Sequence, residues 1–169
     1  MRIDDQSLAG DPSLAERLGS VLQARQWIVA TAESCTGGLI AGAITDVAGS
    51  SAWFDRGFVT YSNEAKIAML GVSAQTLDAH GAVSEAIARE MAIGALRNSA
   101  ATIAVAVTGI AGPAGGTAAK PVGLVCLAWA RRDGPVEVRS EHFAGDRAAI
   151  RTATVTRALE GLIERASKA

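Results

Sequence analysis

An uncharged apolar run at residues 102–108 constrains the fold of this chain more than any other stretch. It reads Thr-Ile-Ala-Val-Ala-Val-Thr, so neither of its alternating faces carries a charge. Such a run is typical of a strand that is buried on both sides, in the middle of a sheet that helices cover. We therefore expect a layered fold built around this strand.

The patterns on either side of this run alternate between helix and strand. Asp11 and Pro12 mark a helix start, with an acidic N-cap and a proline at the first helical position. The turn-like segment 131–135 predicts that the last two strands form a hairpin. The order predicts an α/β fold, a mostly parallel sheet with an antiparallel edge hairpin and helices on both faces. The expected helices are 12–25, 36–47, 63–70, 84–97 and 146 onward, the other strands are 27–32, 53–61, 122–130 and 136–143, and residues 73–82 are a connection.

Length and composition limit the domain organisation and the kind of partner. The chain has 169 residues, of which 49% are hydrophobic, and this suits one domain with a sizeable core. We assign residues 12–169 to that single domain and expect the polar residues 1–11 to be loose. The net charge is −1, from 16 basic and 17 acidic residues, and no basic run of five occurs. This balance argues against binding of nucleic acid through its phosphates.

Cysteine content and hydropathy indicate the cellular compartment in which the protein acts. The two cysteines, Cys35 and Cys126, form neither a disulfide framework nor a paired metal signature, so a reduced, cytoplasmic setting is the simplest interpretation. No apolar run approaches the ~20 residues that span a bilayer, so we expect no membrane association. We also expect the chain to form a homo-oligomer.

Small polar residues and two glycines follow the first predicted strand. Ser34, Cys35 and Thr36 precede Gly37 and Gly38, and a helical pattern comes next. In α/β domains, ligands bind outside the carboxyl ends of the strands. Glycines let backbone N–H groups approach a ligand closely, and a helix N-terminus favours negative charge. The three residues are therefore candidate nucleophiles or anion binders, although Thr36 can alternatively cap the helix.

Two further polar stretches, residues 61–66 and 108–117, follow strands in the same way. If the three strands are parallel neighbours, the stretches meet at one edge of the sheet. A serine nucleophile needs a base, and neither His80 nor His142 lies in these stretches. Lys66 does, near a helix N-terminus that disfavours a second positive charge, and burial would act in the same direction on its pKa. The alternative for Lys66 is a solvated surface lysine.

Cys35 competes with Ser34 for the role of nucleophile, because a helix N-terminus lowers the pKa of a thiol. In an extended segment the two side chains point in opposite directions, so only one of them can face the site. A buried structural role is the alternative for Cys35. The candidate phosphate partners are Lys120, Arg147 and Arg151, and Arg147 stands at a predicted helix N-terminus.

Five motifs together resemble the CinA C-terminal family: TAESCTGG at 31–38, GFVTYSNEAK at 57–66, HGAVS at 80–84, TGIAGP at 108–113 and GDR at 145–147. The resemblance extends over residues 14–165 and implies a three-layer α/β/α sandwich. The family contains nicotinamide-nucleotide amidases. The implied activity is therefore hydrolysis of the carboxamide of nicotinamide mononucleotide (NMN) to nicotinate mononucleotide and ammonia, without a metal or another cofactor.

The resemblance also implies roles for single residues. Ser34 would be the nucleophile and Lys66 the general base. Tyr61 would assist proton transfer or orient the substrate. Thr108 and Gly109 would line the site, and Arg147 would hold the substrate.

Physical reasoning adds Thr36, Gly37 and Gly38 to this set, as donors of hydroxyl or backbone N–H groups to the substrate's phosphate or to an oxyanion. The rival hypothesis is a regulatory or binding domain without turnover, linked to competence or to DNA damage. The presence of Ser34, Tyr61 and Lys66 together favours the enzyme, because a domain without turnover would tolerate the loss of any of them.

Overall fold

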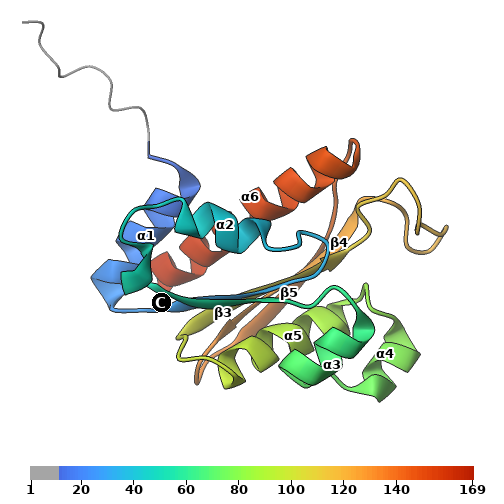
Figure 1. Cartoon of the computed structure of the whole chain (residues 1–169), viewed down its shortest axis with the longest axis horizontal. Helices are drawn as coiled ribbons and strands as arrows, with labels where there is room; N and C mark the ends of the chain where they lie inside the picture. The colour runs from blue at the N-terminus through green and yellow to red at the C-terminus, as the bar shows by residue number, and fades with distance from the viewer. Residues whose placement is uncertain (1–11) are drawn as a thin grey trace, which may run out of the picture.

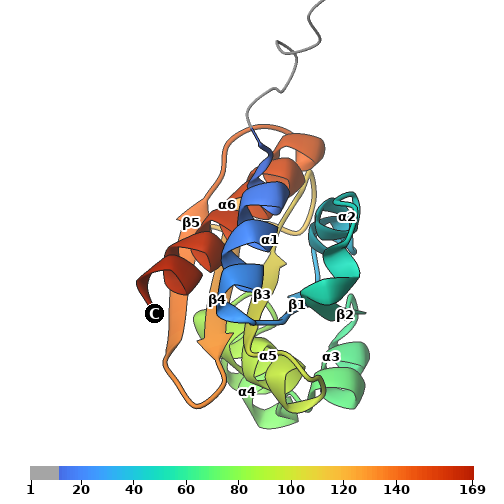
Figure 2. The same cartoon turned by 90° about the vertical axis from the view of Figure 1, so that its left-hand side faces the viewer.

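Two groups of helices cover opposite faces of one sheet (Figures 1 and 2). The computed structural model describes residues 12–169, and the segment predicted to be loose lies outside the described residues. Helices α1 (Leu14–Arg25), α2 (Leu39–Thr45) and α6 (Arg147–Lys168) cover one face, and α3 (Asn63–Leu70), α4 (Ala74–His80) and α5 (Glu85–Arg97) cover the other. The predicted three-layer α/β/α sandwich is confirmed.

The sheet has five strands in the order β2-β1-β3-β4-β5. Strand β1 (Val29–Glu33) pairs in parallel with β2 (Phe54–Val59) and with β3 (Ile103–Gly109). Strand β4 (Leu124–Arg131) is antiparallel to β3, and β5 (Val136–His142) forms the predicted edge hairpin with β4. The sheet is therefore mixed, with two parallel and two antiparallel pairings, and β4 alone runs against the other four strands.

The uncharged run at residues 102–108 forms most of β3, and its side chains contribute to the core on both faces of the sheet. Ile103, Val105 and Val107 point into the core beneath α1 and α6, whereas Ala104 and Ala106 point into the core beneath α5. All five are essentially inaccessible to solvent. The expectation of a central strand buried on both faces is confirmed.

Three local predictions were wrong. Helix α2 begins at Leu39 rather than at residue 36, and its N-cap is Gly38 instead of Thr36. Residues 74–80 form helix α4 instead of a connection; Ser73 caps this helix and Leu77 is buried beneath it. Helix α1 begins at Leu14 rather than at residue 12, because Ser13 and Glu16 form a reciprocal capping box there.

The connection from α2 to β2 contains a single 3₁₀ turn, Ser50–Ala52. Helix α3 then follows β2 almost at once, with Ser62 as its N-cap as predicted. This short connection matters for the site, because it places the first turns of α3 directly beside the carboxyl ends of β1 and β2.

Candidate active site

The carboxyl ends of the three parallel strands meet at one edge of the sheet, so the condition for the polar stretches to converge is met. Ser34 follows β1, Tyr61 follows β2 and Thr108 lies near the end of β3. Together with Lys66 and Arg147 they line one cavity of about 200 Å³. The structure thus gathers five predicted site residues from four separate parts of the chain.

Lys66 lies in the first half of α3, and its side chain turns inward beneath the end of β1. It is only 1% exposed, although it is a charged residue type that is rarely buried without a carboxylate partner. Its Nζ lies 3.0 Å from the Oγ of Ser34. The alternative of a solvated surface lysine is therefore wrong.

The partners of Lys66 determine what its amine can do. Besides Ser34, the Nζ atom contacts two backbone carbonyls, Thr60 O at 2.9 Å and Tyr61 O at 3.3 Å. Carbonyls only accept hydrogen bonds, so each takes one N–H of the amine. A neutral amine has two N–H groups and one lone pair, so the lone pair is left to face the Ser34 hydroxyl. This is the arrangement of a base that is ready to accept the serine proton.

Burial has opposite effects on the pKa values of the two neighbouring ionisable side chains. It lowers the pKa of Lys66, because desolvation penalises the ammonium form. It raises the pKa of the Cys35 thiol to about 11, because desolvation penalises the thiolate. Both groups are therefore driven towards their neutral forms. A neutral amine is a base, whereas a neutral thiol is a poor nucleophile.

Cys35 is 6% exposed and belongs to the hydrophobic core between the sheet and α1, α2 and α6. It also lines the cavity with Ser34, so the prediction that only one of the two residues can face the site was wrong. Burial has the largest effect on the pKa of the thiol and outweighs the backbone hydrogen bond and the nearby cations, which lower it. The hypothesis of a reactive Cys35 is therefore disfavoured, and the packing alternative fits the structure.

Glu33 is a residue of the site that sequence reasoning missed. It ends β1 with only 1% of its surface exposed, and its carboxylate accepts hydrogen bonds from the Thr36 hydroxyl at 2.7 Å, Ile40 N–H at 2.8 Å and Ala41 N–H at 3.0 Å. The carboxylate therefore caps α2 from inside the protein. An acidic residue at the end of an otherwise uncharged strand was the signal for this role.

The predicted donor set at Thr36, Gly37 and Gly38 needs correction, because part of it is already in use. The Thr36 hydroxyl donates to Glu33, and the Gly37 N–H donates to the Ser34 carbonyl at 3.1 Å. None of the three residues lines the cavity that contains Ser34. The anion site expected at the N-terminus of α2 is therefore occupied by the protein's own carboxylate.

Two segments that follow the sheet form the other walls of the cavity. Thr108 and Gly109 line it as predicted, and the Thr108 hydroxyl donates to the Ala82 carbonyl at 2.9 Å. Ala82 and Val83 line the cavity as well. They belong to the HGAVS motif, whose role could not be read from the sequence because both side chains are apolar.

Arg147 opens α6 and bridges the loop segments at the mouth of the cavity. Its guanidinium donates to Gly112 O at 2.8 Å and to the Tyr61 hydroxyl at 3.2 Å. It also lines a neighbouring, wider cavity of about 650 Å³ together with Arg151. Lys120, the third candidate phosphate partner, lines neither cavity and donates instead to the His80 carbonyl.

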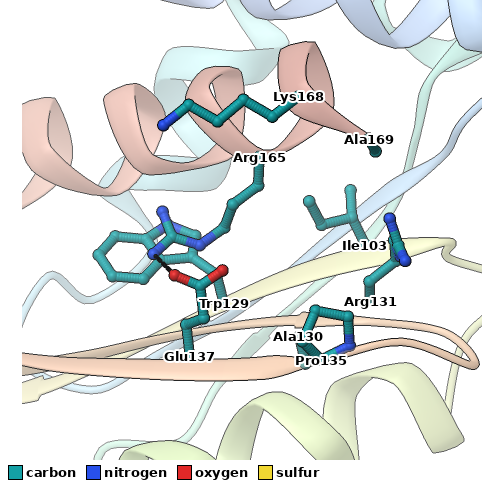
Figure 3. Close-up of a pocket in the computed structure, with 9 residues that line it drawn as sticks. All are labelled: Ile103, Trp129, Ala130, Arg131, Pro135, Glu137, Arg165, Lys168 and Ala169. Carbon is teal, nitrogen blue, oxygen red and sulfur yellow. Dashed lines mark hydrogen bonds and ion pairs between the residues drawn. The ribbon is translucent and has the colours of Figure 1, made fainter.

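A separate cavity of about 160 Å³ lies at the opposite end of β3 (Figure 3). The indole of Trp129 and the guanidinium of Arg165 form one side, and Glu137 is paired with Arg165. It has charged groups but no serine, threonine or cysteine among its lining residues. The cavity at Ser34 is therefore the better candidate for covalent chemistry.

Residues 12–169 contain neither a candidate metal centre nor a candidate membrane-spanning helix. No three or more His, Cys, Asp or Glu side chains in this part of the chain gather as a set that could hold a metal ion. None of its helices combines the length and the apolar character needed to cross a membrane.

Comparisons with known proteins agree with the fold and with the motifs. The model of the CinA C-terminal domain matches residues 11–166. Nicotinamide-nucleotide amidohydrolase PncC of Enterobacter agglomerans is 59% identical over 138 residues, which cover 82% of this chain and 84% of the relative. The protein of the same name from Escherichia coli K12 is 56% identical over 149 residues, which cover 88% and 90%.

Solved structures give the same result. The competence/damage inducible protein CihA of Agrobacterium tumefaciens superposes with a TM-score of 0.88 at 56% identity, over 89% of this chain and 92% of its own. A CinA superfamily protein of Klebsiella pneumoniae superposes with a TM-score of 0.89 at 43% identity, over 92% and 97%. With the match to the family model, these likenesses show that the chain belongs to the CinA C-terminal domain family.

Proposed function

We propose that this protein is a serine amidohydrolase that converts NMN into nicotinate mononucleotide and ammonia. The observation that carries the proposal is the contact between the buried Lys66 amine and the Ser34 hydroxyl at the edge of a cavity. The substrate is inferred from the two relatives named nicotinamide-nucleotide amidohydrolase, which align with most of this chain.

The first half of the reaction forms an acyl-enzyme. The neutral Lys66 amine takes the proton of Ser34, and Ser34 Oγ bonds to the carboxamide carbon. The carbonyl π electrons move to the oxygen, which becomes an oxyanion. When the tetrahedral intermediate collapses, the C–N bond breaks and the Lys66 ammonium gives its proton to the departing nitrogen, which leaves as ammonia. The nicotinoyl group is then held as an ester on Ser34.

The second half regenerates the enzyme. Lys66 is neutral again and takes a proton from a water molecule, whose oxygen attacks the ester carbon. Collapse of the second tetrahedral intermediate breaks the ester bond, and the Ser34 oxygen recovers its proton from Lys66. The product forms as a carboxylic acid, which gives its proton to water and becomes a carboxylate. The same amine therefore serves as base and acid in both halves.

The rest of the substrate fits the cationic mouth of the site. NMN carries a phosphate on its ribose, and Arg147 stands between the cavity at Ser34 and the wider cavity beside it. Tyr61 is 64% exposed and its hydroxyl accepts a hydrogen bond from Arg147, so we assign it to orienting Arg147 and the substrate rather than to proton transfer. Cytoplasmic action, a homo-oligomeric state and the absence of nucleic-acid binding stay predictions.

A direct assay tests the proposal. Purified protein is incubated with NMN, and ammonia and nicotinate mononucleotide are measured together. We expect the two products in equal amounts from the wild type and from Cys35→Ala, and neither from Ser34→Ala. The Cys35 variant is the matched control, because it removes the neighbouring side-chain nucleophile. No product from the wild type would contradict the amidase and favour a domain without turnover, and loss of product in Cys35→Ala alone would move the nucleophile to the thiol.

A further inference from the structure

The turn that carries Ser34 is held by a side chain from the other end of the chain. Arg151, on α6, donates from Nε to the Cys35 carbonyl at 3.1 Å and from Nη2 to the Thr36 carbonyl at 3.2 Å. Two parallel N–H groups of one rigid guanidinium thus fix two successive peptide units. Sequence reasoning considered Arg151 only as a phosphate partner.

The first of these bonds fixes the direction of one backbone donor. A trans peptide unit is planar, so its N–H points away from its C=O. The C=O of Cys35 and the N–H of Thr36 belong to the same peptide unit. Because Arg151 holds that carbonyl on the α6 side, the Thr36 N–H must point away from α6.

The second bond, from Arg151 to the Thr36 carbonyl, fixes the Cys35 N–H group indirectly. Holding the Thr36 carbonyl orients the N–H of Gly37, which donates to the Ser34 carbonyl at 3.1 Å. That carbonyl shares its peptide unit with the Cys35 N–H, so this donor is fixed as well. Within residues 12–169, neither the Cys35 N–H nor the Thr36 N–H donates a hydrogen bond to another residue.

We propose that Arg151 is a positioning residue that aims the N–H group of Cys35, which lines the cavity beside Ser34, at the oxyanion formed when Ser34 attacks its substrate. The proposal rests on the proposed amidase function. An N–H group that directly follows a nucleophile and donates to no other residue is suited to this role, since oxyanion holes use backbone donors that are fixed before the reaction. Arg151 acts through the backbone and takes no part in bond making.

The test separates this role from phosphate binding. Arg151→Lys keeps the charge but offers a point-like ammonium in place of two parallel donors, so it cannot hold both carbonyls with the original geometry. We expect kcat for NMN to fall by about a hundredfold, the effect of losing one oxyanion donor, while KM changes by less than about threefold. Arg151→Met should give at least the same loss of kcat. Arg157→Lys is the matched control on the same helix, because Arg157 pairs with Glu141 away from the cavity, and it should leave both constants unchanged.

The alternative results would overturn the proposal. A raised KM with kcat retained in Arg151→Lys would show that Arg151 binds the substrate's phosphate. Wild-type constants in Arg151→Lys would show that it has no role in the reaction. Because this variant keeps the charge and most of the side chain's packing, its result also stands if Arg151→Met fails to fold.

A second measurement is independent of the natural substrate. A fluorophosphonate probe phosphonylates an activated serine with loss of fluoride, and intact-protein mass reports the rate. We expect labelling of the wild type and of Arg157→Lys, none of Ser34→Ala, and a rate in Arg151→Lys that is reduced about as much as kcat. If the wild type is labelled but hydrolyses no NMN, the proposed substrate is wrong, and the labelling rates still test Arg151. Equal labelling rates in the wild type and Arg151→Lys would contradict the positioning role.

Discussion

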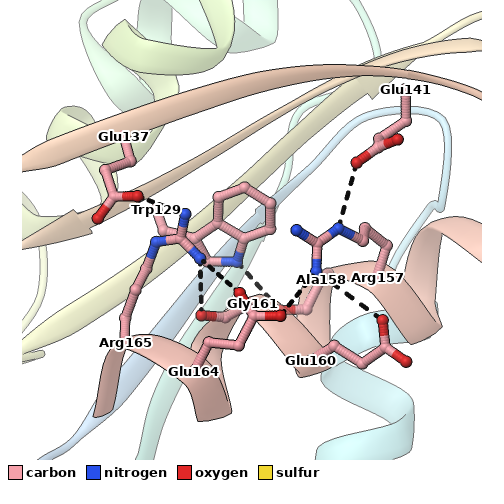
Figure 4. Close-up of polar contacts among 9 residues, drawn as sticks. All are labelled: Trp129, Glu137, Glu141, Arg157, Ala158, Glu160, Gly161, Glu164 and Arg165. Atoms are coloured by element: carbon pink, nitrogen blue, oxygen red, sulfur yellow. Dashed lines mark hydrogen bonds and ion pairs between the residues drawn. The ribbon is translucent and has the colours of Figure 1, made fainter. Parts of the chain in front are cut away.

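Two basic side chains, the buried Lys66 and the partly buried Arg165, lie at opposite ends of the same sheet, and they differ in their partners. Lys66 contacts a hydroxyl and two carbonyls, all of them uncharged. Arg165 lies 4.1 Å above the centre of the Trp129 ring and pairs with Glu137 at 2.8 Å (Figures 3 and 4). Burial lowers the pKa of both, and the carboxylates near Arg165 oppose the shift.

The difference separates a reactive cation from a structural one. A guanidinium is not deprotonated in proteins, so Arg165 stays charged and joins α6 to the hairpin of β4 and β5. Arg157 reinforces this contact from the same helix, with Glu141 as its partner and Trp129 beneath it (Figure 4). Among residues 12–169, no carboxylate pairs with Lys66 to hold its proton, so burial makes the amine a base. Partners, rather than burial alone, determine the role of each cation.

Replacement by methionine at Lys66 and at Arg165 should give the largest contrast in kcat. Lys66→Met removes the general base and should lower kcat by about 10²–10⁴-fold, the usual contribution of such a group. Arg165→Met should leave kcat within about threefold of the wild type, because its contacts lie at the opposite end of β3 from Ser34. Steady-state ammonia release measures both. A Lys66→Met variant with more than a tenth of wild-type activity would contradict the distinction between a reactive Lys66 and a structural Arg165.

Replacement of Arg165 should lower the stability of the protein, although it leaves activity nearly unchanged. Arg165→Met should lower the free energy of unfolding by about 2 kcal/mol, because it removes a cation–π contact and a half-exposed ion pair with Glu137. Urea unfolding followed by tryptophan fluorescence measures the change. Glu137→Gln is the control and should cost less, since the contact with Trp129 remains. No loss of stability in Arg165→Met would mean that the stacked guanidinium is not structural.

The pH dependence of both rate and stability should report on Lys66. Its reactive form is neutral, so kcat/KM should rise about tenfold per pH unit until it levels at a pKa below the ordinary value of about 10.4. Between the lowered folded pKa and about 10.4, the unfolded chain binds more protons than the folded chain, so the wild type should gain stability as pH rises through this window. Lys66→Met should lack this gain. Parallel stability curves for the two proteins from pH 7 to 10 would contradict a lowered pKa.

The smallest effect is expected at Cys35, where burial also favours the neutral form but creates no reactive group. Its pKa of about 11 predicts that the thiol is almost entirely protonated at pH 8. Cys35→Ala should keep kcat within about threefold, and the folded wild type should react with a thiol reagent such as DTNB far more slowly than the urea-unfolded chain. Rapid modification that abolishes activity, and that Cys35→Ala prevents, would give the thiol a role.

The layered fold could be predicted from local patterns. The pairing of Ser34 with Lys66 was open on the residues alone and was predicted from the resemblance to a known family. The uncharged run at 102–108 identified the central strand, and polar residues after three strands identified the edge. Helix α4 was missed since it is short and buries a single large apolar side chain, Leu77, so it has little periodic signal.

Other parts of the site depend on contacts between distant residues. The Glu33 carboxylate folds back over the end of β1 to take the donors of α2, and the spacing of the motif does not show this. Arg151 reaches the nucleophile turn from 115 residues away in sequence. The Arg165 and Trp129 contact also joins separate elements, and its charged residue looks like any other on an amphipathic helix.

The most direct test of the central claim is a titration of the lysine side chains by NMR. The chain contains three lysines, Lys66, Lys120 and Lys168, so ¹³Cε-labelled lysine should give three resolved signals. Lys66→Met identifies the signal of Lys66 by its loss. We predict that this signal titrates at a pKa below the ordinary value of about 10.4, because burial disfavours the ammonium form. A Lys66 signal that titrates at or above 10.4 would contradict the account, because the amine would then be an ammonium at neutral pH and could not accept the proton of Ser34.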